Sequence, residues 1–357
     1  MSMQYGGSNI TFSDGSTQNT APSGFGFKNR IINGAMMIDQ RNAGASVAIG
    51  SGAYPVDRFG AIMNAGTGNT AQRSATAPSG FVNSTLITVG TGAAPTSAQV
   101  GMFYQIIEGL NLADLAWGTS SAQSVTLSFW VRSSLTGAFG CGIKNYSGTR
   151  AYTASYTISA ANTWQQVSVT IPGDTTGTWV TDNTGGPYIA FDIGEGSTRS
   201  QAAGSWTAGN TIGLTSGTKL CATSGATFYI TGVQLEKGST ATSFDYRPYG
   251  TELMLCQRYY EVLNGFNGYG FSATSTVAGN LAYIVKRATP TIGVTGALQV
   301  TSYGVGSNTQ TSANAGIQGA TPNCAYFSFG NFSGITNGVM FYNHIPNSNN
   351  ITVSAEL

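Results

Sequence analysis

Apolar and polar residues alternate along most of the chain, in short runs that end at Gly, Pro, Asn, Asp or Ser about every eight to twelve residues. In the run 125–132 the odd positions are apolar, and the even positions carry Thr, Ser, Trp130 and Arg132. Side chains that alternate with a period of two point to opposite faces of a β-strand. The pattern, which recurs at 164–171, 227–235 and 282–286, therefore predicts an all-β protein.

One stretch departs from this pattern. Residues 252–263 (ELMLCQRYYEVL) contain no Gly or Pro, and Leu255, Tyr259 and Val262 recur at helical spacing. Thr251 can cap the start of a helix and Gly265 its end. The sequence therefore predicts a linking helix within residues 249–265, between two β-rich regions.

Charged residues are rare, because Lys and Arg number 15 and Asp and Glu 14 in 357 residues. This is 8% of the chain, against about 25% in typical soluble proteins. The net charge of +1 offers no general attraction for nucleic acid or an anionic membrane. No run of about 18 apolar residues predicts a membrane span. A surface of Ser, Thr, Asn, Gln and Gly favours sugar recognition or close subunit packing.

The N-terminus and the cysteines add two further expectations. Residues 1–27 are rich in Gly, Ser and Thr, lack the features of a secretory signal, and are too poor in large apolar residues to form a core. The four cysteines match no metal-binding or disulfide framework, so we expect small buried thiols that stay reduced in the cytoplasm. They are Cys141, Cys221, Cys256 and Cys324.

Three segments resemble the jelly-roll carbohydrate-binding modules. Residues 29–34 (NRIING) look like the opening strand of that family, 127–132 (LSFWVR) like a central strand, and 228–238 (FYITGVQLEKG) like the closing strand. Together they span about residues 28–248, and the resemblance implies one jelly roll there. The family often holds a structural calcium with an acid of the closing strand. Thr231 and Gly232 stand at that place here, which leaves Asp57 or Glu236 as possible oxygen donors.

Three further strings resemble bacteriophage tail-fibre and receptor-binding proteins. Residues 10–20 (ITFSDGSTQNT) look like their connector, 27–42 (FKNRIINGAMMIDQRN) like their domain start, and 249–260 (YGTELMLCQRYY) like the helix after their jelly roll. The resemblance implies a virion tail component, assembled in the bacterial cytoplasm, that is commonly a homotrimer and contacts the host surface. The linking helix is then where three chains would meet, through Leu255, Tyr259 and Val262.

Residues suited to catalysis are scarce. His344 is the single histidine, and it cannot form a metal site or a hydrolytic triad alone. Glycan hydrolysis needs two carboxylates, for which Asp192 and Glu195 are the best local pair. Loop carboxylates usually bind backbone amides instead. We therefore expect no enzymatic activity, no cofactor and no metal, and keep a glycan depolymerase as an alternative.

Aromatic residues are the better candidates for function, because Trp and Tyr stack on the apolar faces of sugars while amides and Arg bind the hydroxyls. Trp117 and Trp164 are expected in the core. We expect glycan contacts on the polar strand face, in Gly-rich loops and in the Tyr- and Asn-rich C-terminal turns. The candidates are Trp130, Arg132, Trp179, Trp206, Tyr269, Tyr342 and Asn343.

These observations give four predicted regions: an attachment segment (1–27), a jelly roll (28–248), a linking helix (249–265) and a smaller C-terminal β-sandwich (266–357). The predicted function is adhesion of a virion tail fibre to a glycan on the bacterial surface. The N-terminus is expected to bind other tail or baseplate proteins. Two alternatives stay open: a tail-borne depolymerase, and a tail or baseplate adaptor without adhesive function.

Overall fold

The computed structural model describes most of the 357 residues. In the first 26 it describes only the backbone of three short strands, β1 (Gln4–Gly6), β2 (Asn9–Thr11) and β3 (Thr17–Gln18), which form an antiparallel sheet. From residue 27 onward it describes the chain except for positions 264, 273–274, 297, 303–305, 310–315 and 344–349. Most of the predicted attachment segment and His344 thus lie outside the described residues.

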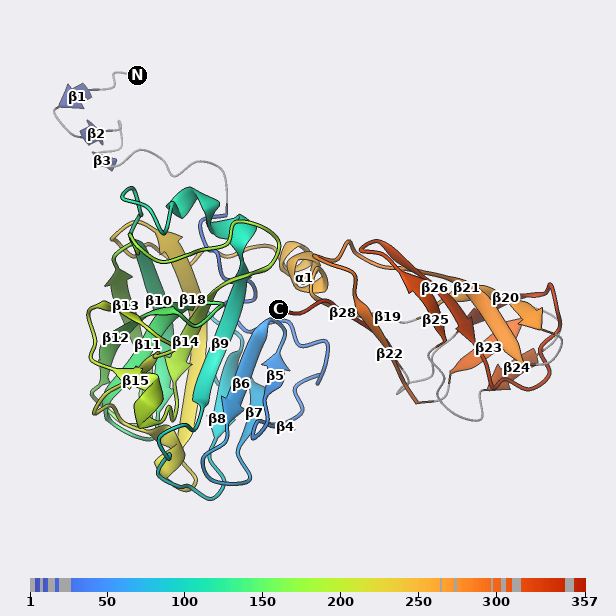
Figure 1. The fold of residues 1–357 in the computed structure, drawn as a ribbon, viewed down its shortest axis with the longest axis horizontal. Coiled ribbons are helices and arrows are strands. Elements are labelled where there is room, and N and C mark those ends of the chain that lie inside the picture. The colour runs from blue at the N-terminus through green and yellow to red at the C-terminus, as the bar shows by residue number, and fades with distance from the viewer. Residues whose placement is uncertain are drawn as a thin grey trace.

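Two antiparallel sheets form the larger, N-terminal part of the molecule (Figure 1). The six-stranded sheet has the order β13 (Gln165–Ile171), β10 (Val125–Ser133), β18 (Thr227–Lys237), β8 (Ser84–Thr88), β7 (Thr70–Ser74) and β4 (Val47–Ala48). The seven-stranded sheet has the order β16 (Trp206–Ala208), β12 (Arg150–Ile158), β11 (Gly137–Asn145), β14 (Gly185–Asp192), β9 (Gly101–Glu108), β6 (Phe59–Met63) and β5 (Ala53–Val56).

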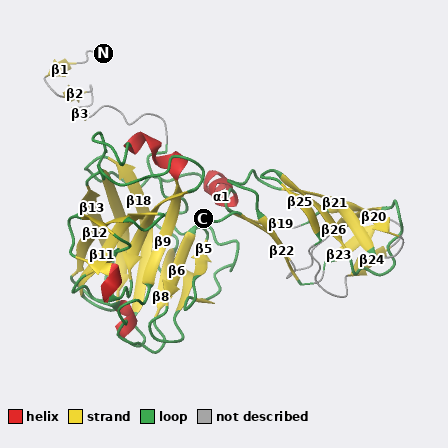
Figure 2. Cartoon of the chain, viewed as in Figure 1, coloured by secondary structure: helices red, strands yellow, loops and turns green. Residues whose placement is uncertain are grey.

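Short elements complete this jelly roll. A parallel pair, β15 (Ser200–Gln201) and β17 (Gly213–Leu214), lies beside the seven-stranded sheet. Three 3-10 helices, η1 (Gly109–Leu115), η2 (Ser197–Arg199) and η3 (Leu220–Ala222), lie in connections. Figure 2 shows how little of the chain is helical.

The core of the jelly roll lies between the two sheets. The apolar face predicted for residues 125–131 is fully buried, with Val125, Leu127 and Val131 at 0% exposure and Phe129 at 1%. Phe129 packs edge-on against Phe191 of the opposite sheet, with 4.9 Å between ring centroids. The period-two prediction is therefore confirmed for this strand, because its inward face fills the sandwich.

The linking helix is shorter than predicted. Helix α1 covers Tyr249–Gln257, and the chain then enters strand β19 (Tyr260–Leu263). β19 pairs with β28 (Asn350–Ser354), which begins almost ninety residues later in the chain. The predicted helix end at 263–265 is wrong, because this long-range pairing takes over four residues whose local spacing is also compatible with a helix.

A second, smaller β-domain follows α1. Its three-stranded sheet has the order β19, β28 and β22 (Thr291–Thr295). Its seven-stranded sheet has the order β24 (Gly306–Thr309), β23 (Gln299–Ser302), β27 (Met340–Asn343), β20 (Asn267–Ser272), β21 (Thr276–Ala282), β26 (Cys324–Phe329) and β25 (Ile317–Ala320). The predicted fold class, an all-β jelly roll followed by a short helix and a smaller β-domain, is confirmed. The residue limits given for the other three regions stay a prediction.

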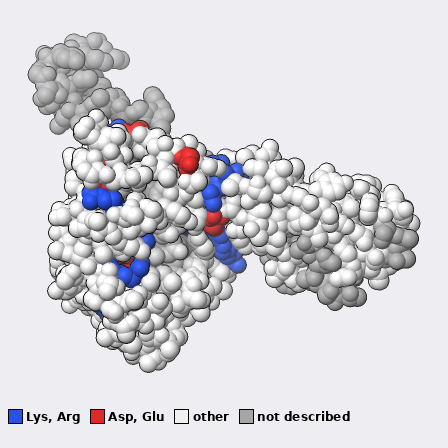
Figure 3. All heavy atoms as spheres, in the orientation of Figure 1, with Lys and Arg blue, Asp and Glu red and all other residues white. Residues whose placement is uncertain are grey.

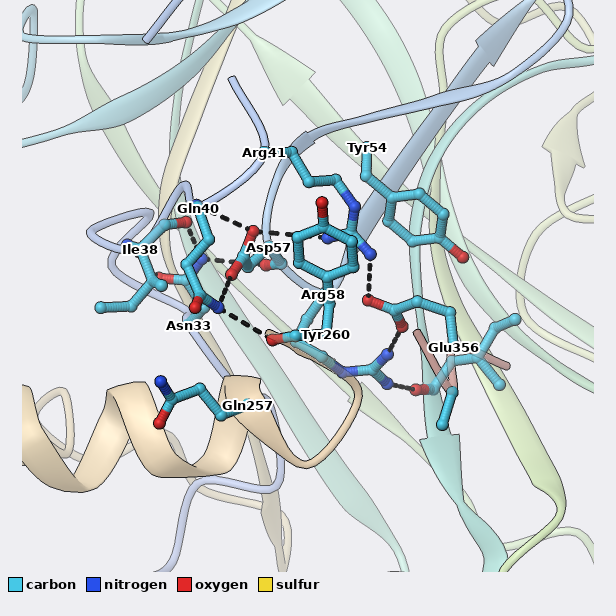
Figure 4. Close-up of polar contacts among 12 residues, drawn as sticks. Asn33, Ile38, Gln40, Arg41, Tyr54, Asp57, Arg58, Gln257, Tyr260 and Glu356 are labelled. Carbon is cyan, nitrogen blue, oxygen red and sulfur yellow. Dashed lines mark hydrogen bonds and ion pairs between the residues drawn. The ribbon is translucent and has the colours of Figure 1, made fainter. Parts of the chain in front are cut away.

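Charged side chains join the two domains. The chain end returns to the jelly roll beside α1 (Figure 1), where Glu356 pairs with Arg58 and with Arg41, whose Nη2 lies 3.0 Å from Oε1. Arg41 also contacts Asp57 at 3.3 Å. We call Arg41, Asp57, Arg58 and Glu356 the junction cluster; Figure 4 shows it in close-up.

Two tyrosines from the start of the C-terminal domain complete the junction. The guanidinium of Arg58 lies 3.4 Å from the ring centroid of Tyr259, and that of Arg41 lies 3.5 Å from the ring of Tyr260. Gln40 donates through Nε2 to the Tyr260 carbonyl at 2.9 Å. These charge and cation–π contacts position the C-terminal domain relative to the jelly roll, together with an apolar cluster in which Ile32 and Ile38 pack against Cys256 and Tyr259.

Candidate binding surfaces

Tyrosine and asparagine side chains cover the outward face of the C-terminal seven-stranded sheet. Strand register places Tyr342 opposite Asn267, Asn267 opposite Asn280, and Asn280 opposite Tyr326. These four residues form a row across β27, β20, β21 and β26, and Tyr269 lies two residues along β20 from Asn267. We call these five residues the Tyr/Asn face.

The alternation of each strand explains why these rings face solvent. In β26 Ala325, Phe327 and Phe329 are buried, so Tyr326 between them points outward and is 48% exposed. Tyr342 is 47% exposed and Tyr269 36%. A hydrogen bond with Tyr326 raises the pKa of Tyr269. Two tyrosines from non-adjacent strands thus touch above the sheet.

The Tyr/Asn face continues into a hollow at the β25 edge. The hollow has a volume of about 350 Å³. Cys324, at the start of β26, is exposed there, with Sγ 3.6 Å from the Thr321 hydroxyl. The expectation of four buried cysteines is therefore wrong at Cys324 and confirmed at the other three. The lining residues are Asn280, Gln318, Gly319, Ala320, Thr321, Cys324 and Tyr326.

The Tyr/Asn face has no charged neighbours within its own domain. The sequence contains no Lys, Arg, Asp or Glu at 265–285 or 288–355. The two cations between these stretches lie at the junction: Lys286 pairs with Glu261 at 2.6 Å, and Arg287 donates to the backbone carbonyls of Ala355 and Glu356. Figure 3 shows a C-terminal domain without charged atoms on the visible face. Such a surface can bind ligands by stacking and neutral hydrogen bonds.

The structure brings two of the predicted contact residues together here. Tyr269 and Tyr342 share the Tyr/Asn face, and Asn343 is the last residue of β27, paired with Val300. The sequence analysis missed Tyr326 and Asn280, and it expected a turn where Asn267 and Tyr269 lie in strand β20. The alternation Ala-Tyr-Phe-Ser-Phe at 325–329 was the signal that could have placed Tyr326 on the solvent face.

Trp130 and Arg132 lie on the outer face of the jelly roll's six-stranded sheet, as the alternation in β10 predicts. Both are half-buried. The Trp130 ring lies beside Gly232, where φ is +61° and a Cβ would meet the Phe81 ring at 2.7 Å. Trp164 was expected in the core but is half-buried on this face, with its ring 6.1 Å from that of Tyr229.

Trp179 and Trp206 are half-buried and pack against a third indole, and their predicted glycan contact stays a prediction. Their ring centroids lie 5.7 Å apart, and both pack edge-on against Trp117, at 4.7 and 5.9 Å. Trp179 Nε1 donates to Asp174 at 3.1 Å, and Trp206 Nε1 donates to the Pro172 carbonyl at 2.7 Å. Trp117 is buried, as expected, so the three indoles close one part of the jelly-roll core.

The carboxylates proposed for hydrolysis are buried and engaged. Asp192 accepts hydrogen bonds from the amides of Gly194, Glu195 and Leu214 and from Lys219 Nζ at 2.6 Å. Glu195 accepts from Arg199 Nε at 2.5 Å. Exposure is 1% for Asp192 and 0% for Glu195. Burial raises the pKa of Glu195 to about 7. Both groups are buried and hydrogen-bonded, and Glu195 Oε1 has no hydrogen-bond partner among the described residues.

The acids considered for calcium are likewise engaged. Asp57 accepts from Gln40 Nε2 at 2.6 Å and pairs with Arg41. Glu236 accepts from the Thr242 hydroxyl and from Gln234 Nε2. Within the described residues, no group of three His, Cys, Asp or Glu side chains is placed to hold a metal.

The trimer-contact candidates do not share one helix face. Leu255 is half-buried on α1, Tyr259 follows the helix and is 1% exposed beneath Arg58, and Val262 lies in β19. Tyr259 is therefore an internal residue of one chain, and the expectation of a three-residue helical contact is wrong in this detail. None of the described helices is long and apolar enough to cross a membrane.

Comparisons with known proteins give structural matches alone. No family model matches the chain, and no curated protein matches its sequence. A protein from Bacteroides thetaiotaomicron provisionally assigned to sugar binding matches 59% of this chain and 100% of its own, at 15% identity and a TM-score of 0.36.

Two further matches have lower TM-scores. A family 11 carbohydrate-binding module of Clostridium thermocellum covers 53% of this chain and 92% of its own, at 15% identity and a TM-score of 0.27. The enzymatically active domain of tailspike protein 4 of bacteriophage CBA120 covers 59% of this chain and 22% of its own, at 12% identity and a TM-score of 0.30. The surfaces above are therefore interpreted from their own geometry.

Proposed function

We propose that the chain is a non-enzymatic adhesin of a bacteriophage tail and binds a neutral glycan on the bacterial surface through the Tyr/Asn face. The observation that carries the proposal is the row Tyr342–Asn267–Asn280–Tyr326, which is exposed, uncharged and continuous across four strands. The resemblance of residues 10–20, 27–42 and 249–260 to tail-fibre proteins supports the virion location.

The chemistry of this row suits a sugar. A pyranose presents flat C–H faces that stack on tyrosine rings, and its hydroxyls exchange hydrogen bonds with amides that both donate and accept. Rigid strands hold the rings in place, which limits the entropy lost on binding. The hollow of about 350 Å³ beside Tyr326 can take a further sugar unit, whose hydroxyls would meet Asn280, Gln318 and Thr321.

Weak contacts of this kind become strong through copy number. The proposed homotrimer would present three Tyr/Asn faces to one cell surface, and several fibres would present more. Multivalent attachment raises effective affinity by about 10²–10⁴ without new contacts. Adhesion is thus compatible with a face that makes no ion pairs.

The two alternative functions, a depolymerase and a tail or baseplate adaptor, make different demands on the structure. A depolymerase acting through Asp192 and Glu195 would need both carboxylates to reach substrate, whereas both are buried and bound to Lys219 and Arg199. An adaptor would use the same exposed rings against another virion protein. Binding to isolated glycan separates adhesin from adaptor.

The test is binding of the full chain to an array of neutral and acidic bacterial polysaccharides, with the double variant Tyr326→Ala/Tyr342→Ala. We expect at least about tenfold weaker binding to a neutral glycan, since each stacked ring supplies a large share of the contact. Tyr249→Ala, which removes a ring that is 55% exposed on α1, is the matched control. Equal binding by both variants, or no glycan binding at all, contradicts the proposal.

A further inference from the structure

Arg132 differs from every other cation in the molecule. All fifteen Lys and Arg residues lie in the described part of the chain, and fourteen of them donate to a carboxylate, a hydroxyl, an amide or a backbone carbonyl there. Arg132 makes no hydrogen bond or ion pair with a described residue, and its Nε is buried and unsatisfied. The buried Nε–H of Arg132 is left without an acceptor, which is costly unless a ligand supplies one.

One aromatic ring lies against this cation, and two more lie on the same face. Its guanidinium carbon lies 5.1 Å from the ring centroid of Tyr229, which is directly opposite Arg132 in the neighbouring strand β18. Trp164, just before β13 on the other side of β10, approaches Tyr229 to 6.1 Å between centroids. Trp130 lies two residues away on the same face, opposite the exposed Gln166.

Carboxylates are distant from Arg132 on this face. The six strands of the sheet contain one acid, Glu236. Glu236 pairs in register with Thr126, six residues from Arg132 along β10, which is about 20 Å at strand spacing. It is buried and already bonded to Thr242. The positive charge of Arg132 is therefore not neutralised from within the sheet.

The other half of this face is covered by the chain itself. Thr126 and Thr170 donate to the carbonyls of Gly238 and Ser239, and Phe244 packs against Phe81 at 5.1 Å. The segment after β18 thus crosses the sheet at the end away from Arg132. The uncovered end presents Arg132, Tyr229 and Trp164, and Trp130 lies at its border, beside Gly232 and the Phe81 ring.

We propose that this uncovered end binds a sugar that bears a carboxylate. The arginine fork matches a planar carboxylate with two parallel hydrogen bonds. The rings of Trp164, Tyr229 and Trp130 suit the flat face of the pyranose that bears it, and Gln166 can bind a hydroxyl. The site differs from the Tyr/Asn face in position and in charge, so it stands or falls independently of the function proposed there.

The test is a titration of the full chain with trigalacturonate, with its methyl ester and with an oligoglutamate peptide. Calorimetry and tryptophan fluorescence measure the binding. We expect the acid to bind. The ester should bind at least about tenfold more weakly, because it keeps the sugar rings but lacks the carboxylate charge. Arg132→Gln should weaken binding of the acid to the level of the ester, and added salt should weaken it in the wild type.

Three controls decide the interpretation. Lys237→Gln removes an exposed cation from the same sheet and should leave binding within about twofold, since its charge is already shared with Asp114. Tyr326→Ala should leave it unchanged, which separates this site from the Tyr/Asn face. Equal binding of acid and ester, no binding of either, or an equal loss in Lys237→Gln overturns the proposal. Binding of oligoglutamate as tight as that of the trisaccharide assigns the site to acidic peptides and overturns the sugar.

Discussion

The C-terminal domain uses opposite kinds of chemistry at the junction cluster, where its Glu356 meets Arg41, Asp57 and Arg58 of the jelly roll, and on the Tyr/Asn face. At the junction, Glu356, Arg41 and Arg58 form ion pairs that are at most 15% exposed. On the Tyr/Asn face, no charged residue lies among the strands, and three tyrosines are 36–48% exposed. The few charged residues of the domain therefore lie at the junction, where they hold the domain in place.

This contrast suggests how a protein with so few charges divides its functions. Buried ion pairs are sensitive to the loss of one partner, which makes them suitable for fixing one relative orientation of two domains. Exposed tyrosines and amides lose little stability when exchanged, so a binding face built from them can vary while the fold persists. The structure therefore separates the part that must stay constant from the part that can change.

The largest effect is expected at the junction. Arg58→Met should lower the free energy of unfolding by about 3 kcal/mol, because it leaves Glu356 with Arg41 as its remaining partner and Tyr259 without the cation on its ring. Chemical denaturation measures this loss. The double variant Arg58→Met/Glu356→Gln should recover part of it. A loss below about 1 kcal/mol would mean that the junction is not held by this pair.

The next largest effect is a difference in stability loss between variants at two adjacent residues on opposite faces of β26. Phe327→Ala should destabilise the C-terminal domain by about 3 kcal/mol, because its ring is fully buried and stacks on Phe329 at 4.4 Å. Tyr326→Ala should change stability by only about 0.5 kcal/mol. Thermal unfolding of both variants tests the register directly. Similar losses would refute the assignment of Tyr326 to the solvent face.

A third effect concerns pH. The pKa of Glu195 is about 7 in the folded chain, above its usual value of 4.5, since burial disfavours the charged carboxylate. The folded state therefore binds more protons than the unfolded state between these values, and stability should rise by about 2–3 kcal/mol as the pH falls from 8 to 5. Glu195→Gln should flatten this part of the pH profile of stability. An unchanged slope in the variant would assign the pH dependence to other groups.

The smallest expected effect is a difference in the salt dependence of ligand binding between the two proposed sugar sites. Raising the salt concentration from 50 to 300 mM should leave binding at the Tyr/Asn face within about twofold, because no ions take part. The same change should weaken a carboxylate ligand at Arg132 severalfold. Titrations of Tyr326→Ala and Arg132→Gln with neutral and acidic trisaccharides measure each site separately. A strong salt dependence at the Tyr/Asn face would contradict its neutral character.

Local pattern was sufficient for the strands at 125–131, 164–171 and 227–235 but wrong at 282–286, because β21 ends at Ala282 and the following residues lead to Lys286 at the junction. The alternation at 125–131 correctly predicts which side of β10 is core, because burial and period two are local properties. The end of α1 was mispredicted because Tyr260–Leu263 pair with residues 350–354, and no local window contains that information. Trp179 and Trp206 lie in Gly-rich sequence, in a loop and at the start of β16, and they meet Trp117 only in the folded chain. Asn267 and Asn280 become neighbours of Tyr326 and Tyr342 only through strand order.

Hydroxyl-radical footprinting of the full chain, with and without a neutral glycan found on the array, tests the central claim most directly. The account predicts that Tyr326 and Tyr342 become protected from oxidation when the glycan binds, while the similarly exposed Tyr249 is oxidised at the same rate in both states. Protection confined to the jelly roll, with Tyr326 and Tyr342 unchanged, would contradict it.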